Sequence, residues 1–239
     1  MCRPVLGYGR CMALLPRLRQ LIRRPTSASR VGAVRPTSAK RHGDSLHEDA
    51  LRSMLSDDPN NEPAFRALAE IVRRRAAESF DERDPLAAQA DETERAQAEN
   101  FAVWALAEEF AGNPRGWYPL VELARLSVHD DHDATLRRLV TAADRDPSGR
   151  ALAEGLKLLR EAEQPVEALG LGVGHWRVRE QDPEVARQLV HAALEAGRPL
   201  EARQYLAALG QREDAAELSD LRDELAEVVA QAEQTLPGT

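Results

Sequence analysis

The chain has 239 residues, of which 43% are hydrophobic and 30% charged, and its formal net charge is -8. This composition is typical of a folded body rather than of a wholly disordered chain, and the length suffices for one or two domains. An acidic body repels phosphates, which excludes non-specific nucleic-acid binding by that body.

The first 43 residues differ from the rest in charge. They contain ten basic residues and no acidic residue, so residues 44–239 hold 22 basic and 40 acidic side chains, a net charge of -18. We predict that this leader is disordered, because a chain rich in Arg, Ser, Thr and Pro cannot bury enough apolar surface. Both cysteines, Cys2 and Cys11, lie in it, which excludes a disulfide framework for the body.

Residues 12–24, MALLPRLRQLIRR, have the pattern of a short basic amphipathic helix. Three interpretations stay open: contact with an anionic membrane surface, binding to an acidic partner or to the acidic body, and a mitochondrial transit peptide. Met12 is also a candidate alternative start. The chain has no apolar run of membrane-spanning length and no secretory signal pattern. We therefore expect a cytoplasmic protein, with a mitochondrial or membrane-peripheral location as the alternative if the leader is a targeting segment.

Residues 44–111 are predicted to form an N-terminal helical segment. Ser45 and Glu48 have the spacing of a capping box at the start of its first helix. Residues 79–93 lose helical periodicity and become acidic, which indicates a loop or linker. The helices on either side, near 62–78 and 94–111, are expected to pair as a hairpin.

Residues 94–111 resume the helical pattern and carry four large apolar residues. We place Phe101 and Trp104 on the apolar stripe of this helix, with Leu106 and Phe110 one position off that stripe.

Residues 112–212 contain a repeat with an offset of 34 residues. The segments LLREAEQPVEALGLG (158–172) and AALEAGRPLEARQYL (192–206) align so that Ala162 matches Ala196, Pro165 matches Pro199, and Ala168 matches Ala202. A second marker recurs alongside, as Asn113-Pro114, Asp146-Pro147 and Asp182-Pro183. Asp or Asn before Pro ends one helix and caps the next, with Pro in its first turn. Gly197 suits the end of a first helix, and the small Ala168 and Ala202 suit a close helix crossing.

This pattern of helix, short turn, helix and Asp-Pro resembles the tetratricopeptide repeat (TPR) family over three units, 115–146, 148–182 and 184–212. The resemblance implies an all-α fold of antiparallel helical hairpins stacked as a short α-solenoid, which binds proteins or peptides. The usual aromatic and Gly positions of the family are mostly replaced here, so the repeat is degenerate. A non-repetitive helical bundle is the alternative.

Residues 213–239 are predicted to form a C-terminal capping helix and tail. Leucine and other apolar residues recur there at steps of three and four, from Leu218 to Ala232. The stripe is too short for a coiled-coil assignment. A helix that covers the last hairpin is the preferred interpretation, and a dimer seam is the alternative.

Two motifs suggest chemistry, and neither has a convincing context. The HDDHD segment (129–133) contains metal-ligand residue types, but the repeat places it at a hairpin turn where Asp131 or Asp133 is expected as an N-cap. The GLGVG segment (170–174) is similar to a nucleotide loop, but it falls inside a predicted helix, where small residues permit close packing. We assign no catalytic residue, no metal ligand and no cofactor, and expect that the chain is not an enzyme.

The candidate binding surface comes from the TPR resemblance. In that family the first helix of each hairpin lines a concave groove, and the matching positions here are mostly basic. The basic ones are Arg150, Lys157, Arg160, Arg187 and His191, and the stripe also includes Ala153 and Leu194. The peptide-carboxylate clamp of the family uses Asn, and none stands at these positions. A solvated helix face with salt bridges to neighbouring Glu is the alternative.

We therefore predict a non-enzymatic protein–protein interaction scaffold that binds a peptide or protein partner, for which an acidic segment is a candidate, in a locally basic groove. Two alternatives remain. The first is a peripheral membrane adaptor anchored by the basic amphipathic N-terminal segment. The second is a helical metal-binding protein or enzyme whose site the sequence does not reveal.

Overall fold

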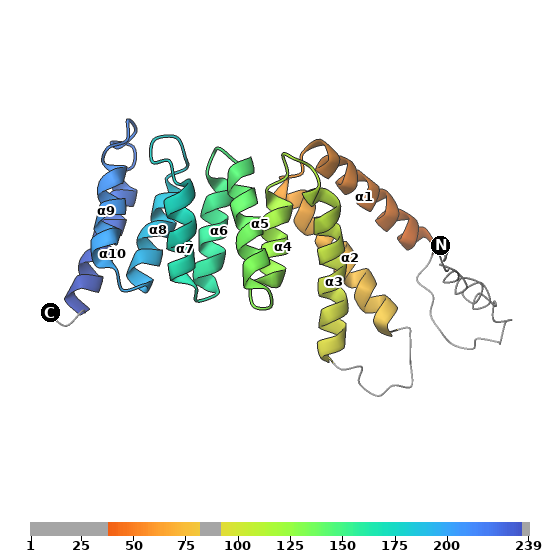
Figure 1. Cartoon of the computed structure of the whole chain (residues 1–239). Coiled ribbons are helices and arrows are strands. Elements are labelled where there is room, and N and C mark those ends of the chain that lie inside the picture. Colours follow the sequence, from red (N-terminus) through yellow and green to blue (C-terminus); the bar gives the residue numbers. More distant parts are fainter. Residues whose placement is uncertain (1–37, 82–91, 236–239) are drawn as a thin grey trace, which may run out of the picture. The chain divides into compact units, whose positions relative to one another are not determined.

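The computed structural model describes residues 38–81 and 92–235, and within these ranges the chain forms ten α-helices and no β-strand (Figure 1). The helices are α1 (Ser38–Asp57), α2 (Glu62–Asp81), α3 (Glu92–Ala111), α4 (Tyr118–Ser127), α5 (His132–Arg145), α6 (Arg150–Glu161), α7 (Pro165–His175), α8 (Glu184–Glu195), α9 (Pro199–Leu209) and α10 (Ser219–Thr235). The predicted all-α class is confirmed for this part of the chain.

The helices pack in sequential pairs, so that α2 lies against α3, α4 against α5, α6 against α7, and α8 against α9. Pairs also contact each other in chain order, because α4 meets α6, α6 meets α8, and α5 meets α7. The second helices of the last three hairpins begin at residues 132, 165 and 199, intervals of 33 and 34 residues. The hairpin arrangement is therefore confirmed, and helix α10 adds to the last pair by packing on α8 and α9.

The turns inside the hairpins follow the predicted chemistry. Asp131 is the N-cap of α5, and its side chain accepts a hydrogen bond of 2.9 Å from the Ala134 N–H. Pro165 and Pro199 are the first residues of α7 and α9. Gly197 ends the preceding helix with a φ of 70°, and Glu163, 34 residues earlier, has a φ of 60°. The same left-handed turn therefore closes α6 and α8, and only one of the two positions holds the glycine that this conformation favours.

The Asp-Pro turns between hairpins differ from the prediction. The N-cap of α6 is Gly149 and not Asp146, although the buried Asp146 carboxylate accepts hydrogen bonds from the Ala151 N–H of the first turn at 2.7 Å and from the Ser148 N–H at 3.1 Å. Helix α6 begins only at Arg150, so Pro147 lies outside the helix rather than in its first turn. The carboxylate reaches the helix from a longer loop than the Asp-Pro pattern implies.

The core consists of small and branched apolar side chains. The expected stripe of α6, Leu152, Leu156 and Leu159, is completely buried, and so are Ala168 and Ala202 at the two hairpin crossings. Burying one such leucine contributes about 1.5–3 kcal/mol relative to leaving it in water. Both alanines are therefore buried in helices that contact their hairpin partners, as expected for close crossings.

Three boundaries predicted near the N-terminus need correction. Helix α1 begins at Ser38, so it includes the last residues assigned to the 1–43 leader, and Ser45 lies inside it rather than at its N-cap. Helix α2 extends to Asp81 and α3 starts at Glu92, so the loop predicted at 79–93 is shorter at both ends. Residues 1–37, which include the amphipathic segment 12–24, and residues 82–91 and 236–239 lie outside the described residues.

The stripe assigned to α3 is wrong. Phe101 is 73% exposed, whereas Leu106 and Phe110, placed one position off the stripe, are buried with Val103. Helix α3 carries apolar residues on more than one side, and its packing against both α2 and α4 selects the buried face. An aromatic side chain is therefore left on the surface.

Candidate functional site

The five residues predicted to line a basic groove lie on two helices that contact each other. Arg150, Lys157 and Arg160 belong to α6, and Arg187 and His191 belong to α8. Arg150 and Lys157 are exposed, and the other three are partly buried. The structure thus brings the two predicted sets of side chains onto neighbouring helices.

Each of the four permanent cations in this set also faces a glutamate. Arg160 binds Glu195 at 2.5 Å, Arg150 binds Glu62 at 3.0 Å, and Lys157 lies 4.0 Å from Glu161. Arg187 pairs with Glu224 of α10 and, at 3.0 Å, with Glu184 of its own helix. The three arginines therefore link neighbouring helices: Arg150 links α6 to α2, Arg160 links α6 to α8, and Arg187 links α8 to α10. Each exposed pair contributes about 0–1 kcal/mol, so a competing ligand meets little resistance in replacing the glutamate.

Arg150 occupies a distinct acidic setting. Its guanidinium carbon lies 5.6 Å from the centre of the Trp117 ring, a cation–π distance. It borders a hollow of about 150 Å³ whose other charged side chains are all carboxylates: Glu62, Glu154, Asp182 and Glu184. The positive charge of Arg150 is neutralised there, so this end of α6 is not an anion site.

His191 is the titratable member of the set. Burial lowers its pKa below the ordinary value, and the nearby Arg160 and Arg187 lower it further, while Glu195 and Glu224 act in the opposite direction. Folding therefore disfavours the charged imidazole. The resulting contribution to stability is present above the unfolded His pKa of about 6.5 and is lost as the pH falls through the lower folded value.

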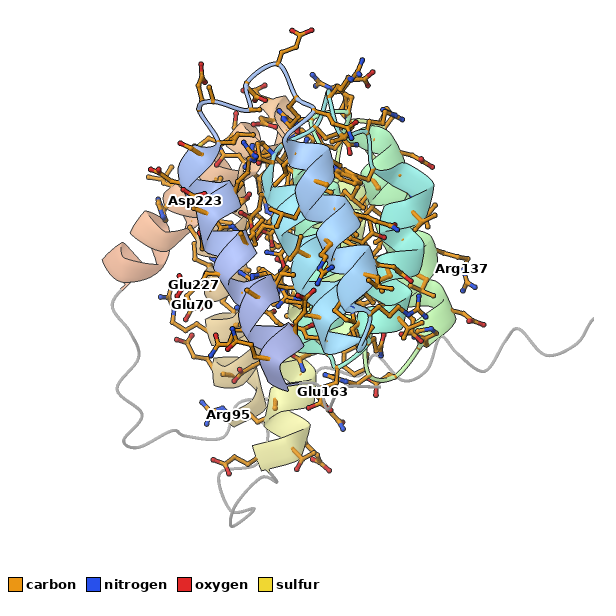
Figure 2. All side chains as sticks on the ribbon, turned by 90° about the vertical axis from the view of Figure 1, so that its left-hand side faces the viewer. Glu70, Arg95, Arg137, Glu163, Asp223 and Glu227 are labelled. Carbon is orange, nitrogen blue, oxygen red and sulfur yellow. The ribbon has the colours of Figure 1, made fainter. Side chains whose placement is uncertain are left out.

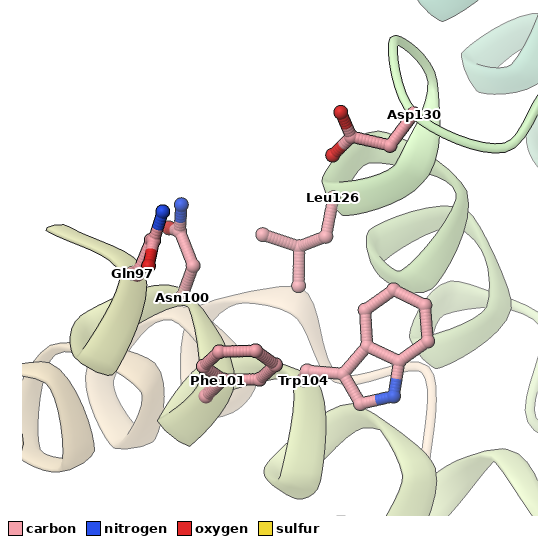
Figure 3. A pocket seen from close by; sticks show the side chains of 6 residues that line it. All are labelled: Gln97, Asn100, Phe101, Trp104, Leu126 and Asp130. Carbon is pink, nitrogen blue, oxygen red and sulfur yellow. The ribbon is translucent and has the colours of Figure 1, made fainter. Parts of the chain in front are cut away.

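A second surface feature was missed by the sequence analysis. Phe101 and Trp104 of α3 lie opposite Leu126 of α4 across an apolar hollow of about 210 Å³ (Figure 3). Gln97, Asn100 and Asp130 complete the lining. The apolar residues could be read in the sequence, but nothing there indicated that α3 would turn Phe101 outward next to α4.

The two aromatic walls of this hollow are held differently. The Arg138 guanidinium carbon lies 4.6 Å from the centre of the Trp104 ring, and an Arg138 N–H donates a 2.9 Å hydrogen bond to Ser127 Oγ. Ser127 and Thr135 are buried and share a further hydrogen bond of 2.9 Å. Trp104 is therefore fixed by its neighbours, whereas Phe101 is mostly in contact with water.

The HDDHD segment serves as a turn and a helix start. Residues 129–131 belong to the turn after α4, where Asp131 caps α5 as described above, and His132 and Asp133 are the first two residues of α5. Among the described residues we find no group of three or more His, Cys, Asp and Glu side chains that is arranged to hold a metal ion. GLGVG lies within α7, where Gly172 packs on Leu189 of α8.

Long-range contacts to the backbone also escaped the sequence analysis. Asn60 Oδ1 accepts hydrogen bonds from the Trp117 N–H at 2.8 Å and the Tyr118 N–H at 3.0 Å, which caps α4 from a different hairpin. Arg145 donates from one nitrogen to the carbonyls of Ala111, Asn113 and Gly116, at the end of α3 and in the loop before α4. Arg212 donates from one nitrogen to the carbonyls of Val178 and Gln181, in the loop before α8. The partners are roughly 30–60 residues apart, beyond the reach of any helical periodicity.

Comparison with known proteins gives no match: no family model, no curated protein and no solved structure resembles this chain. Within the described residues, no helix combines the length and the apolar character needed to cross a bilayer. The functional proposal below therefore depends on the geometry of the chain itself.

Proposed function

We propose that this chain is a non-enzymatic interaction scaffold, a TPR-like stack of helical hairpins that holds a peptide or protein partner. The observation that carries the proposal is the apolar hollow between α3 and α4, where Phe101 is 73% exposed beside Trp104 and Leu126. A large aromatic side chain in water is an unused source of binding energy, because docking a partner against it removes apolar surface from water. Aromatic residues of this kind dominate binding energy in protein interfaces.

The surrounding helices support this assignment. Trp104 is held by Arg138, and α3 and α4 pack directly on each other, so the Trp104 side of the hollow is formed before a partner arrives. A preformed surface loses less conformational freedom on binding than a mobile one. The hollow is also smaller than the 300–1,000 Å³ that is usual for small-molecule pockets, which favours an anchoring side chain of a larger partner.

A photo-crosslinking experiment tests the proposal. With benzoylphenylalanine in place of Phe101, irradiation of cells that express the chain is expected to give discrete protein adducts, seen as shifted bands and identified by mass spectrometry. The matched control places the same group at Val173 of α7, which is 75% exposed and outside the hollow. Adducts at neither position, or the same adducts at both, would contradict the proposal.

A second candidate is binding of an acidic segment along α6 and α8. It is favoured by the contact between these helices, which places Arg160 and Arg187 close enough to lower the pKa of His191. Such a ligand would replace the glutamates that now face these cations.

Charge reversal tests this second candidate. The double variant Lys157→Glu, Arg187→Glu is expected to weaken binding of a fluorescent poly-glutamate peptide at least tenfold, because both attractions become repulsions. Fluorescence anisotropy measures the Kd. The control is Arg203→Glu, which reverses an exposed arginine of α9 that pairs with Glu233. If the double variant and the control bind the peptide with the same Kd, the α6–α8 face is not the binding site.

A further inference from the structure

We infer that the hollow between α3 and α4 selects a basic amphipathic helix, which inserts one large apolar side chain between Phe101 and Leu126 and directs Lys or Arg to Asp130. This inference rests on the proposed function and adds the chemical class of the partner. It follows from the lining of the hollow, from its size and from the charge around it.

The lining combines apolar walls with a polar rim that carries negative charge. Phe101, Trp104 and Leu126 form the walls, and Asp130 is the only charged side chain among the six lining residues of this hollow. Figure 3 shows the Asp130 carboxylate at the edge of the hollow on the side of α4. An apolar anchor that carries a neighbouring cation therefore matches both parts of the surface.

Two arginines on the helices around this hollow are already engaged. Arg138 stacks on Trp104 and donates to Ser127 Oγ, and Arg95, earlier on α3, lies 3.5 Å from Glu99. Asp131 follows Asp130 in the turn, Asp133 stands in the first turn of α5, and both are exposed, so the charge beside the rim is negative. An acidic ligand would meet repulsion here.

The size of the hollow limits the occupant. A volume of about 210 Å³ suits a single large side chain rather than a whole ligand. Amphipathic helices bind in this way, with apolar anchors at helical spacing in a groove and charged residues at its edge.

Defined peptides test the inference on the full chain. We use three fluorescent peptides of about 15 residues, a length at which an isolated helix is marginally stable. The first has Leu on one face and Lys on the other, the second has Glu in place of Lys, and the third has Ser in place of Leu. Anisotropy titrations are expected to show saturable binding of the Leu/Lys peptide and at least tenfold weaker binding of the other two.

Variants place this binding at the hollow. Phe101→Ser is expected to raise the Kd of the Leu/Lys peptide at least tenfold, and Asp130→Asn to raise it several-fold with a smaller dependence on salt. The control Val173→Ser changes a similarly exposed apolar residue of α7 and leaves the Kd unchanged. Phe101 and Asp130 are both exposed, so circular dichroism is expected to show unaltered folding.

Each other outcome overturns the inference. If the Leu/Glu peptide binds as tightly as the Leu/Lys peptide, the partner is not selected for basic charge. If the Ser/Lys peptide binds as tightly as the Leu/Lys peptide, binding depends on charge attraction alone and not on an apolar anchor. Light scattering that shows a dimer, lost in Phe101→Ser, assigns the hollow to a second copy of the chain. If no peptide binds, the partner class is wrong, and adducts at position 101 in the crosslinking experiment still decide separately whether the hollow binds a protein.

Discussion

Replacing Gly172 with Val is expected to lower the free energy of unfolding by about 2–3 kcal/mol, as overpacking of a filled core does. Gly172 lies in α7 against α8, and a Cβ added there would fall well inside van der Waals contact with Leu189 Cδ2 and 3.3 Å from Leu189 Cγ. Leu189 is completely buried, so either its side chain would have to repack against its neighbours or α7 and α8 would have to move apart.

The same helix supplies the control for this prediction. A Cβ at Gly170 or Gly174 would meet nothing within 4 Å. Gly170→Ala is thus expected to raise the free energy of unfolding by about 0.5–1 kcal/mol, through helix propensity alone. Urea unfolding followed by circular dichroism measures both variants. A Gly172→Val protein as stable as the parent would show that α7 and α8 do not approach as closely as described.

Replacing Arg145 with Ala is expected to lower the free energy of unfolding by about 2–3 kcal/mol, because it leaves several partly buried carbonyls without a charged donor. Arg145 Nη1 lies 2.9 Å from the Ala111 oxygen, 3.0 Å from the Asn113 oxygen and 2.8 Å from the Gly116 oxygen. Ala111 is the last residue of α3, where a positive charge is also favourable for the helix dipole.

Two further variants separate this role from a general effect of charge. Arg145→Lys keeps a cation with three donors, so it is expected to recover part of the loss. Arg137→Ala removes an exposed arginine from the same helix, whose side chain points outward in Figure 2, and should change stability by less than about 0.5 kcal/mol. Hydrogen exchange between Ala111 and Gly116 that is unaltered in Arg145→Ala would refute the proposed clamp.

The parts of the candidate site that could be predicted are those with local causes. The 34-residue offset correctly predicted that α6 and α8 are equivalent helices of adjacent hairpins. It therefore also predicted that their basic residues lie on neighbouring helices. Their partners could not be predicted, because Glu195 and Glu224 come from helices whose facing sides depend on packing. The prediction that these cations bind a partner stays a prediction.

The hollow between α3 and α4 could not be predicted from the sequence. Its apolar residues could be identified, but Phe101 was assigned to the wrong side of α3. In a helix with apolar residues around most of its circumference, periodicity does not identify one face. Only the simultaneous packing of α3 on α2 and α4 excluded Phe101 from the core and placed it opposite Leu126.

The sequence by itself determined the helices of the repeat, their pairing and several of their turns. These features depend on contacts between residues a few positions apart: the Asp131 cap, Pro165 and Pro199 at helix starts, and the left-handed turn at Gly197. Tertiary structure alone decided which charges are paired, which backbone groups Arg145 holds, and that an aromatic residue faces solvent between α3 and α4. Those outcomes depend on side chains that are distant along the chain and are brought together by the burial of the core, and local propensity carries no information about them.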